Sequence, residues 1–151
     1  MNEKYMEIAL TEAKKAYLAN EIPVGAVIVY KNKVIAQTHN LKNENNCILF
    51  HAELSAIKQA SIYFNNWRLT DCSIYITLEP CPMCASAIKQ ARIKNVYYGV
   101  PSQNETNSEI VRKIFQNSDI NSTVEVYGDI LKEKCLKILQ DFFKKKRKNK
   151  S

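Results

Sequence analysis

Apolar and polar residues alternate along the chain with two different periods, which predict where helices and strands lie. Residues 3–19 carry apolar side chains every three or four positions with Lys and Glu between them, which predicts an amphipathic helix. Residues 22–30 and 34–38 are rich in Val and Ile and flank a polar turn at 31–33. They predict a β-hairpin in which Asn32 takes a left-handed backbone conformation.

The rest of the chain alternates helices with strands. The predicted elements are a helix at 51–61, a strand at 73–78, a helix at 81–92, a strand at 96–100, a helix at 109–117, a strand at 123–127 and a last helix that runs into the C-terminus. Residues 41–47 and 101–108 are polar and predict loops. Ser108 and Asp129 are the expected N-caps of the last two helices, because their side-chain oxygens can accept a backbone N–H.

The order of these elements predicts an α/β domain. A hairpin followed by three helix–strand units is typical of a three-layer α/β/α sandwich, here with a mixed five-stranded sheet and helices on both faces. The helix between the fourth and fifth strands favours a parallel, right-handed crossover at that point.

Length and charge divide the chain into a domain and a short tail. The 151 residues correspond to one domain, which we place at 1–143, followed by a basic tail at 144–151. The net charge is +7, and six positive charges without any acidic residue lie in the tail, so the rest of the chain is close to neutral. A clustered basic segment suits a phosphate backbone, although a solubilising, disordered end has the same composition.

The sequence also indicates a cellular compartment. The first residues lack the basic and apolar regions of a secretory signal, and the longest apolar run is too short to span a bilayer. We therefore expect a cytoplasmic protein that does not enter a membrane. In that compartment the five cysteines are expected to be metal ligands or buried thiols rather than disulfides. Cys72 and Cys135, in particular, are expected to be small buried hydrophobic residues.

Two short motifs carry the candidate chemistry, His-Ala-Glu and Pro-Cys-Pro-Met-Cys. The thiolates of Cys81 and Cys84 stand at the start of a predicted helix and can face one zinc ion, and His51 can supply a third ligand. Three protein ligands leave one position for water, which is typical of a catalytic zinc site. Glu53 lies two residues from His51 and is the candidate for proton transfer. Together the motifs match the signature of zinc-dependent nucleobase deaminases.

Other interpretations of these residues stay open. Cys47 could complete a purely structural zinc site, although that interpretation gives no role to Glu53. A redox role for the two motif cysteines leaves His51 and Glu53 without a role. Glu79 is a candidate for orienting the loop beside the cysteines by hydrogen bonding. His39 is expected to be a satisfied surface or core residue.

The chain resembles the bacterial tRNA-specific adenosine deaminases, the TadA family, from about residue 5 to residue 148. The resemblance is carried by Asn40 and Ala52 and by the segments Ile-Pro-Val-Gly-Ala-Val at 22–27, Thr-Leu-Glu-Pro-Cys at 77–81, Ala-Arg-Ile at 91–93, Gly-Asp-Ile-Leu at 128–131 and Asp-Phe-Phe at 141–143. The zinc motif alone specifies only the deaminase superfamily. The Asp-Phe-Phe segment, followed by basic residues, narrows the resemblance to enzymes that act on tRNA.

This resemblance implies a cytidine deaminase-like fold and a homodimer with one Zn²⁺ in each subunit. It implies that the reaction is the hydrolytic deamination of adenosine to inosine at the first anticodon position, the wobble position, of an arginine tRNA. The partner implied is the tRNA anticodon stem-loop.

The resemblance also implies roles for individual residues. Asn40 is expected to hydrogen-bond the flipped nucleotide, the Ala52 backbone to contact the base, and Val24 to pack against it. The residues expected to contact the anticodon stem-loop lie near the C-terminus and combine aromatic rings with positive charge: Phe142, Phe143, Lys144 and Arg147.

One segment departs from the family pattern. After Gly99 the family usually has an aspartate followed by a loop rich in Lys and Gly, whereas this chain has Ser102 at the aspartate position and no glycine in 101–108. The different sequence of this segment is expected to affect which substrate is preferred more than the deamination reaction itself.

Two other functions fit parts of the sequence. A free-base deaminase acting on guanine or cytosine would share the zinc site and the fold, but a small base needs no phosphate-binding surface. A non-enzymatic zinc or RNA-binding protein would have no use for Glu53. Binding of tRNA weakens steeply as salt rises, whereas turnover of a free base hardly changes. This difference separates a tRNA deaminase from a free-base deaminase.

Overall fold

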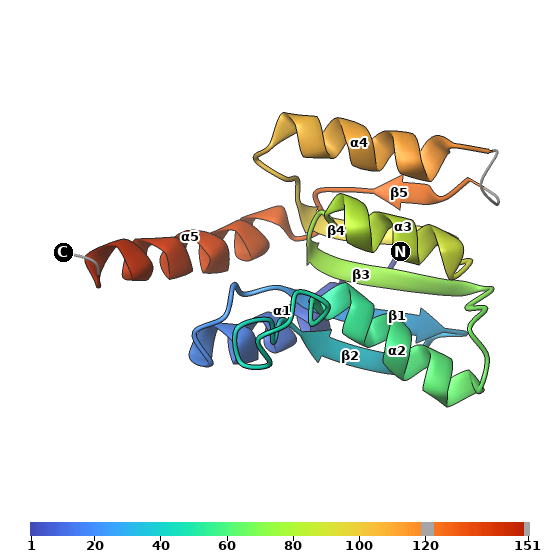
Figure 1. Ribbon diagram of the computed structural model, residues 1–151, viewed down its shortest axis with the longest axis horizontal. Helices are drawn as coiled ribbons and strands as arrows, with labels where there is room; N and C mark the ends of the chain where they lie inside the picture. The colour runs from blue at the N-terminus through green and yellow to red at the C-terminus, as the bar shows by residue number, and fades with distance from the viewer. Residues whose placement is uncertain (119–122, 150–151) are drawn as a thin grey trace.

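The structure, a computed structural model, describes residues 1–118 and 123–149. Its helices and strands follow the order that the sequence predicts (Figure 1). In chain order the elements are α1 (Glu3–Leu18), β1 (Gly25–Tyr30), β2 (Lys33–His39), α2 (Ala52–Phe64), β3 (Cys72–Leu78), α3 (Pro82–Gln90), β4 (Asn95–Val100), α4 (Glu105–Gln116), β5 (Glu125–Tyr127) and α5 (Lys132–Lys148). Between β1 and β2, Asn32 has a φ of 62°, as the hairpin requires.

The strands form one mixed five-stranded sheet, as predicted, and their order in it is β2-β1-β3-β4-β5. β1 pairs antiparallel with both β2 and β3, while β3 with β4 and β4 with β5 are parallel. The parallel pairing of β4 with β5 confirms the parallel direction of the crossover predicted before the last strand. Gly25 at the start of β1 lies opposite His39 at the end of β2. The carboxyl ends of β2, β3 and β4 therefore meet at one end of the sheet, and the residues that follow them come together there.

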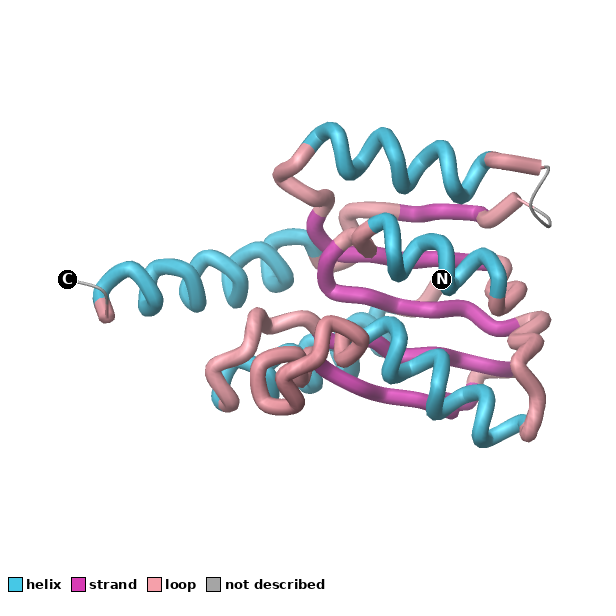
Figure 2. Tube along the Cα trace, viewed as in Figure 1, coloured by secondary structure: helices cyan, strands magenta, loops and turns pink. Residues whose placement is uncertain are grey.

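Helices cover both faces of the sheet, which makes the three-layer α/β/α sandwich predicted from the sequence (Figures 1 and 2). α2, α3 and α4 pack on one face around a core that includes Ile28 and Phe115. α1 and α5 pack on the other face around Met6 and Leu139. The C-terminal part of α5 extends past the end of the sheet (Figure 1). Among residues 1–118 and 123–149, no helix combines the length and the hydropathy that a bilayer span needs.

Helix α4 begins earlier than the sequence predicts, and the expected N-cap is wrong. Its N-cap is Asn104, whose Oδ1 accepts the backbone N–H of Asn107 at 3.1 Å. Ser108 therefore lies inside the helix, where its hydroxyl donates to the Glu79 carboxylate at 2.6 Å. Asn and Ser are similarly favourable N-cap residues, so the sequence alone could not decide whether the helix begins after Asn104 or after Ser108.

Helix α5 begins later than predicted, because Asp129 does not cap it. Asp129 and Leu131 both have positive φ, and the helix starts at Lys132. The helix then continues to Lys148, so residues 144–148 of the basic segment are helical, while residues 150–151 lie outside the described part. The basic side chains consequently have fixed positions around the helix axis.

Gly25 marks the closest approach of α1 to the sheet. A Cβ atom there would lie 1.9 Å from the carbonyl oxygen of Ala9 and 2.8 Å from the backbone nitrogen of Ala13. Both are backbone atoms of a helix, so they cannot move unless α1 shifts off β1. The backbone N–H of Gly25 also donates to the Thr77 hydroxyl at 3.1 Å, which ties this point to β3.

We predict that Gly25→Ala lowers the free energy of unfolding by about 3 kcal/mol, because overpacking against rigid backbone costs this much. Urea denaturation followed by circular dichroism measures the change. A midpoint equal to that of the wild type would contradict the close contact between α1 and β1.

Candidate metal centre

Three potential metal ligands meet at the end of the sheet where β2 and β3 finish. His51 is the N-cap residue of α2, Cys81 is the N-cap residue of α3, and Cys84 lies in the first turn of α3. The His51 Nδ1 atom lies 3.7 Å from the Cys81 Sγ and 3.5 Å from the Cys84 Sγ. We call these three residues the His–Cys–Cys cluster. It is the one such group of His, Cys, Asp and Glu within the described residues.

The local sequence explains why the cysteines point to one place. β3 ends at Leu78, and Pro82 occupies the first turn of α3, where its missing N–H costs nothing. Cys81 and Cys84 therefore lie within a single helical turn and share one side of it. The partial positive charges at the N-termini of α2 and α3 both favour thiolates at this position.

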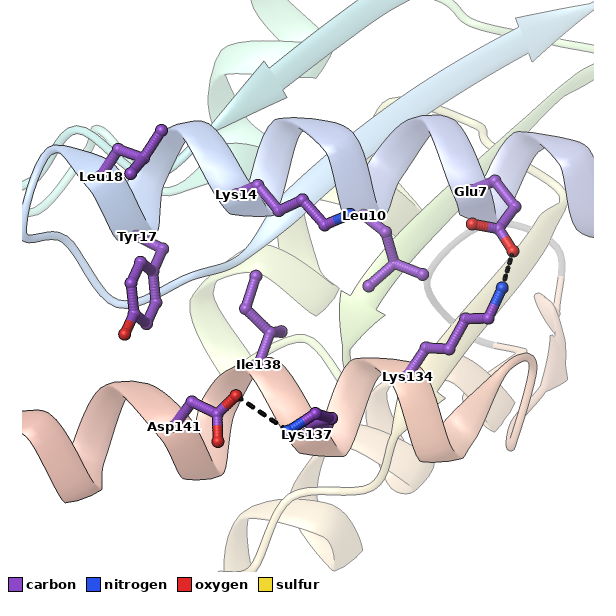
Figure 3. A pocket seen from close by; sticks show the side chains of 9 residues that line it. All are labelled: Glu7, Leu10, Lys14, Tyr17, Leu18, Lys134, Lys137, Ile138 and Asp141. Atoms are coloured by element: carbon purple, nitrogen blue, oxygen red, sulfur yellow. Dashed lines mark hydrogen bonds and ion pairs between the residues drawn. The ribbon is translucent and has the colours of Figure 1, made fainter.

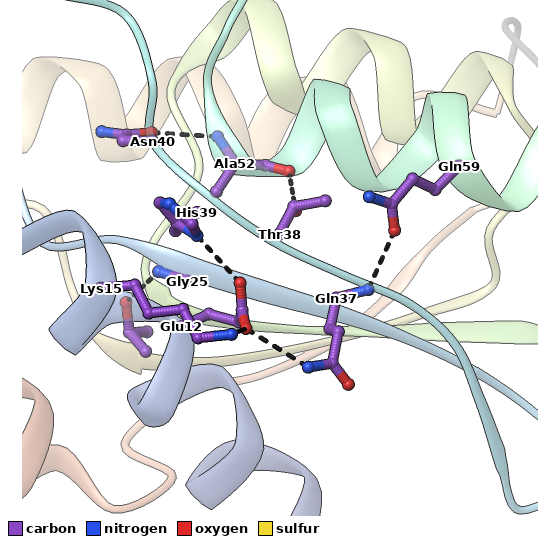
Figure 4. Close-up of polar contacts among 10 residues, drawn as sticks. Glu12, Lys15, Gly25, Gln37, Thr38, His39, Asn40, Ala52 and Gln59 are labelled. Atoms are coloured by element: carbon purple, nitrogen blue, oxygen red, sulfur yellow. Dashed lines mark hydrogen bonds and ion pairs between the residues drawn. The ribbon is translucent and has the colours of Figure 1, made fainter. Parts of the chain in front are cut away.

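The start of α2 is tied to the end of β2 by two hydrogen bonds on one residue. The Asn40 Oδ1 atom accepts the Ala52 N–H at 2.9 Å, and the Thr38 hydroxyl donates to the Ala52 carbonyl oxygen at 2.6 Å (Figure 4). His51 and Glu53 flank Ala52 in the chain, so these bonds position both side chains.

The donor atoms of the cluster fit a tetrahedral metal ion. With bond lengths of about 2.1 Å to nitrogen and about 2.3 Å to sulfur, tetrahedral geometry separates a nitrogen ligand from a sulfur ligand by about 3.6 Å. The observed separations of 3.7 and 3.5 Å match this value. One nitrogen and two sulfur ligands leave a fourth position free, which is the donor set of a catalytic rather than a structural site.

Hydrogen bonds within the cluster shift the pKa values of all three ligands, and only the pKa of Cys81 moves toward the deprotonated form that a metal requires. The hydrogen bond from the Cys84 thiol lowers the pKa of Cys81 to about 4, although burial opposes the shift. The same hydrogen bond and burial raise the pKa of Cys84. Hydrogen bonding to Cys81 raises the pKa of His51. A metal ion would displace these protons and take their place between the three ligands.

Glu53 lies beside the cluster without belonging to it. Its side chain is only 4% exposed, and burial raises its pKa to about 7. A carboxyl group with this pKa can both accept and release a proton at neutral pH. The cluster itself contains only His51, Cys81 and Cys84, which is the division between ligands and proton carrier that the motifs predict.

A cavity of about 210 Å³, which we call the cluster cavity, opens beside these residues. His51, Cys81 and Glu53 line it, so the chemistry faces the cavity. The rest of the lining is made by four apolar residues and five polar ones: Ile22, Val24, Leu78 and Pro80, and Asn40, Lys42, Glu79, Ser102 and Asn107. A small cavity in which apolar surface adjoins several converging polar groups is typical of small-ligand recognition.

A second cavity, of about 830 Å³, adjoins the cluster cavity and shares Ile22, Leu78 and Ser102 with it. We call it the α5 cavity, because Phe143, Lys144 and Arg147 of α5 line it. Residues about 60 positions beyond the cysteines in the sequence therefore lie next to the cluster cavity. The Phe143 ring is 45% exposed and is open to a ligand.

The remaining predicted binding residues lie in different surroundings. Val24 and Asn40 line the cluster cavity. Ala52 is fully buried, and both its backbone polar groups bond within the protein. Phe142 is 4% exposed and packs edge-on against Tyr17 of α1, with 6.0 Å between ring centroids, so it does not line the α5 cavity.

Sequence reasoning did not identify Lys42 and Asn107 as lining residues. Asn107 reaches the cavity because α4 begins at Glu105, which places the first turn of that helix where a loop was expected. Lys42 lies two positions after Asn40 in the chain, and this proximity was the one feature of the sequence that could have identified it as a lining residue.

The structure also shows the surroundings of Glu79 and of the three cysteines outside the cluster. Glu79 was expected to orient the loop beside the cysteines, but its side chain instead accepts the Ser102 N–H at 2.9 Å and the Ser108 hydroxyl at 2.6 Å. It therefore holds the segment after β4 and the first turn of α4. Cys47 is partly exposed and lies outside the His–Cys–Cys cluster. The two cysteines expected to be buried, Cys72 and Cys135, are fully buried.

His39 is satisfied by a buried carboxylate, Glu12 of α1. Glu12 is 3% exposed and accepts hydrogen bonds from Lys15 at 2.6 Å, from His39 at 2.9 Å and from Gln37 at 3.3 Å (Figure 4). Burial alone raises the pKa of Glu12, but the hydrogen bonds from Lys15 and His39 outweigh it and hold that pKa below its ordinary value. The Glu12 carboxylate thereby anchors the end of β2, from which Asn40 extends to α2.

A third cavity lies between α1 and α5 and contains no member of the cluster (Figure 3). Its volume is about 640 Å³, and Leu10 and Ile138 contribute apolar surface. Its lysines are largely neutralised, because Lys134 pairs with Glu7 and Lys137 with Asp141. This groove therefore offers neither a metal site nor a strong positive charge.

Nearly the whole chain is similar in sequence to known deaminases. The model of the MafB19-like deaminase family matches residues 1–147. A tRNA-specific adenosine deaminase of Streptococcus pyogenes serotype M18 (strain MGAS8232) is 38% identical over 146 residues, which cover 97% of this chain and 92% of the relative. The enzyme of the same name from Bacillus subtilis (strain 168) is 38% identical over 149 residues, 99% of this chain and 92% of the relative.

Two solved structures are similar in both fold and sequence. One comes from a study of A-to-I editing by tRNA:A34 deaminases at the wobble position. It has a TM-score of 0.84 and 34% identity, and the match covers 91% of this chain and 100% of that one. The guanine deaminase from Bacillus subtilis is also 34% identical, but its TM-score is 0.66 and the match covers 84% of this chain and 85% of that one.

We predict that Glu12→Gln destabilises the protein by about 2 kcal/mol at pH 7, because an amide cannot replace a carboxylate that accepts charged hydrogen bonds. The groups facing Glu12 are Lys15 on α1 and Gln37 and His39 on β2. Since the folded pKa of Glu12 is lowered, its contribution is present at neutral pH and is lost as the pH falls below about 4. Thermal melts of the two proteins should therefore converge as the solution becomes acidic, and a difference that is constant with pH would contradict this account.

Proposed function

The chain belongs to the MafB19-like deaminases and to the tRNA-specific adenosine deaminases, and we propose that it converts the wobble adenosine of a tRNA to inosine. The observation that carries this function is the buried Glu53 carboxyl beside three ligand atoms spaced for a tetrahedral metal ion. The reaction consumes one water and releases one ammonia. It therefore needs a group that takes a proton from water and a group that gives one to the leaving amine.

His51, Cys81 and Cys84 are the residues that would hold one Zn²⁺ in each subunit. Zinc bound by such ligands acts as a Lewis acid that makes water acidic enough to attack a base at neutral pH. The protein's contribution is the fixed spacing of the three ligands. Cys84 is fully buried, whereas His51 and Cys81 are partly exposed and face the cluster cavity, from which water and a substrate can reach the site.

Glu53 is the proton carrier in this proposal. Its carboxylate accepts a proton from the attacking water and delivers it to the amino group that leaves C6 of adenine as ammonia. Burial keeps the pKa of Glu53 near 7, so the loss and gain of the proton are closely balanced at neutral pH. One carboxyl group can then serve both halves of the reaction.

The cluster cavity is the proposed site of the flipped base. The Asn40 carbonyl oxygen is already bonded to Ala52, which fixes the orientation of its amide and leaves the NH₂ group to donate to the nucleotide. Val24 offers apolar surface for the base to pack against. The Ala52 backbone, which lies between His51 and Glu53 in the chain, is proposed to contact the base.

The α5 cavity favours tRNA over a free base as the substrate. Phe143 offers a stacking surface, and Lys144 and Arg147 offer charges for phosphates, next to the cluster cavity. A free guanine or cytosine would use none of these groups. The similarity to a guanine deaminase keeps a free base as the second candidate, because the cluster cavity alone could hold one.

Three finer statements belong to the same proposal. We take the substrate to be an arginine tRNA, by resemblance to the family. A tRNA substrate places the enzyme in the cytoplasm. The active form is proposed to be a homodimer, in which residues 1–143 form the deaminase domain and the basic segment 144–151 contributes to RNA binding.

We predict that Glu53→Gln lowers inosine formation by about 1,000-fold and leaves the zinc content unchanged, because the amide cannot carry the proton. The assay incubates zinc-loaded protein with an arginine tRNA bearing adenosine at the wobble position and detects inosine by sequencing. His51→Ala is the matched control, and it should lose both zinc and activity.

The outcomes of this experiment separate the candidate functions. Loss of zinc in Glu53→Gln would make Glu53 a ligand rather than a proton carrier. A folded, zinc-loaded wild type that makes no inosine would overturn the tRNA proposal, and guanine and cytosine would then be tested as substrates.

We predict that the double variant Lys144→Gln/Arg147→Gln binds tRNA more weakly and reduces the slope of log affinity against log salt by about 2, one for each phosphate contact. The double variant Lys145→Gln/Lys146→Gln is the control. It removes the same charge from the same helix, but these lysines lie over the Tyr17 and Phe142 rings. Fluorescence anisotropy measures both slopes, and equal losses would mean that the α5 cavity has no special role.

A further inference from the structure

Lys42 brings a positive charge into the lining of the cluster cavity. It lies in the segment between β2 and α2 and shares the cavity with His51 and Glu53. Lys42 is partly buried at this position. Its side chain therefore lies close to the residues proposed to carry the reaction.

The backbone around Lys42 is fixed by a buried carboxylate. Glu21 is 1% exposed, and both its oxygens accept the backbone N–H of Asn43, at 2.7 and 2.9 Å. The Lys42 carbonyl oxygen also accepts the Cys47 N–H at 3.1 Å. Lys42 thus extends from an anchored backbone, unlike a lysine on a loose surface loop.

No carboxylate in the described part of the chain forms an ion pair with Lys42. The Glu79 carboxylate shares the cavity but is bonded to Ser102 and Ser108. An unpaired cation beside the reacting centre favours an anionic ligand. The adenine base and its ribose are neutral at pH 7, so the nearest anion that the substrate carries is a backbone phosphate.

We propose that Lys42 binds a phosphate that flanks the nucleotide in the cluster cavity, and so favours a nucleotide within an RNA chain over a free base or nucleoside. The inference rests on the proposed function. Lys42 does not line the α5 cavity, where Lys144 and Arg147 lie. The chain therefore supplies positive charge at two separate places around the flipped nucleotide. Phosphate contacts position a nucleic acid without reading its sequence, which is the role assigned to Lys42.

The test compares Lys42→Met, Lys42→Arg and Lys113→Met as zinc-loaded proteins. Methionine keeps the length of the side chain and removes the charge. Lys113, in the last turn of α4, is the control, because it lies outside the lining of both the cluster cavity and the α5 cavity. Two quantities are measured for each protein: kcat/KM for inosine formation in an anticodon stem-loop, and the salt dependence of stem-loop binding by fluorescence anisotropy.

Lys42→Met is expected to lower kcat/KM about tenfold, the effect of losing one charged hydrogen bond. Its slope of log affinity against log salt should fall by about 1. Lys42→Arg should restore both values, and Lys113→Met should match the wild type. Zinc content and thermal midpoint equal to those of the wild type establish that Lys42→Met is folded.

The two proposals fail in different ways. If the wild type forms inosine but Lys42→Met keeps the wild-type kcat/KM and salt slope, Lys42 binds no phosphate and the proposed function stands. If the wild type forms no inosine, the proposed function fails, and the salt slope of stem-loop binding still decides the role of Lys42. A slope that is unchanged in Lys42→Met overturns the phosphate contact in either case.

Discussion

The two hydrogen bonds on the backbone of Ala52, one from Thr38 and one to Asn40, hold the start of α2 against the end of β2. The rest of the site depends on this junction. His51 and Glu53 stand on either side of Ala52, and Cys81 begins α3 after β3, two strands away in the sheet. The distance between the ligands is therefore set by strand pairing rather than by flexible loops. A shift of one residue in the pairing of a strand would move each of its side chains to the opposite face of the sheet, and the ligands would no longer meet.

Two buried glutamates, Glu12 and Glu53, show how one residue type takes different roles in different surroundings. Glu12 is surrounded by donors from Lys15 and His39, so its pKa is lowered and it works as a fixed anchor. Glu53 is equally buried, but the desolvation of its carboxyl dominates and raises its pKa to about 7. The first environment holds a charge in place, and the second prepares a group to exchange a proton.

The sequence predicted the parts of the structure that depend on local pattern. The order of the elements, the mixed sheet and the convergence of His51 with the two cysteines all follow from hydrophobic periodicity and from ligand spacing. The lining of the cavity could not be predicted in the same way, since it depends on where helices begin. Asn104 competes with Ser108 as a cap, and only the folded chain shows that the earlier cap brings Asn107 to the cavity. Likewise, nothing local distinguishes Lys42 from the many other lysines, because its position is fixed by the distant Glu21.

Phe142 and Phe143 are neighbours in the chain, yet they belong to different surfaces of α5. Phe142 is packed against Tyr17, while Phe143 lines the cavity beside the site. Substitutions at these two positions are therefore expected to differ in effect, one acting on the packing of α5 against α1 and the other on the surface of the cavity beside the site. A helix divided in this way allows recognition to diverge during evolution while the domain that carries the chemistry remains intact.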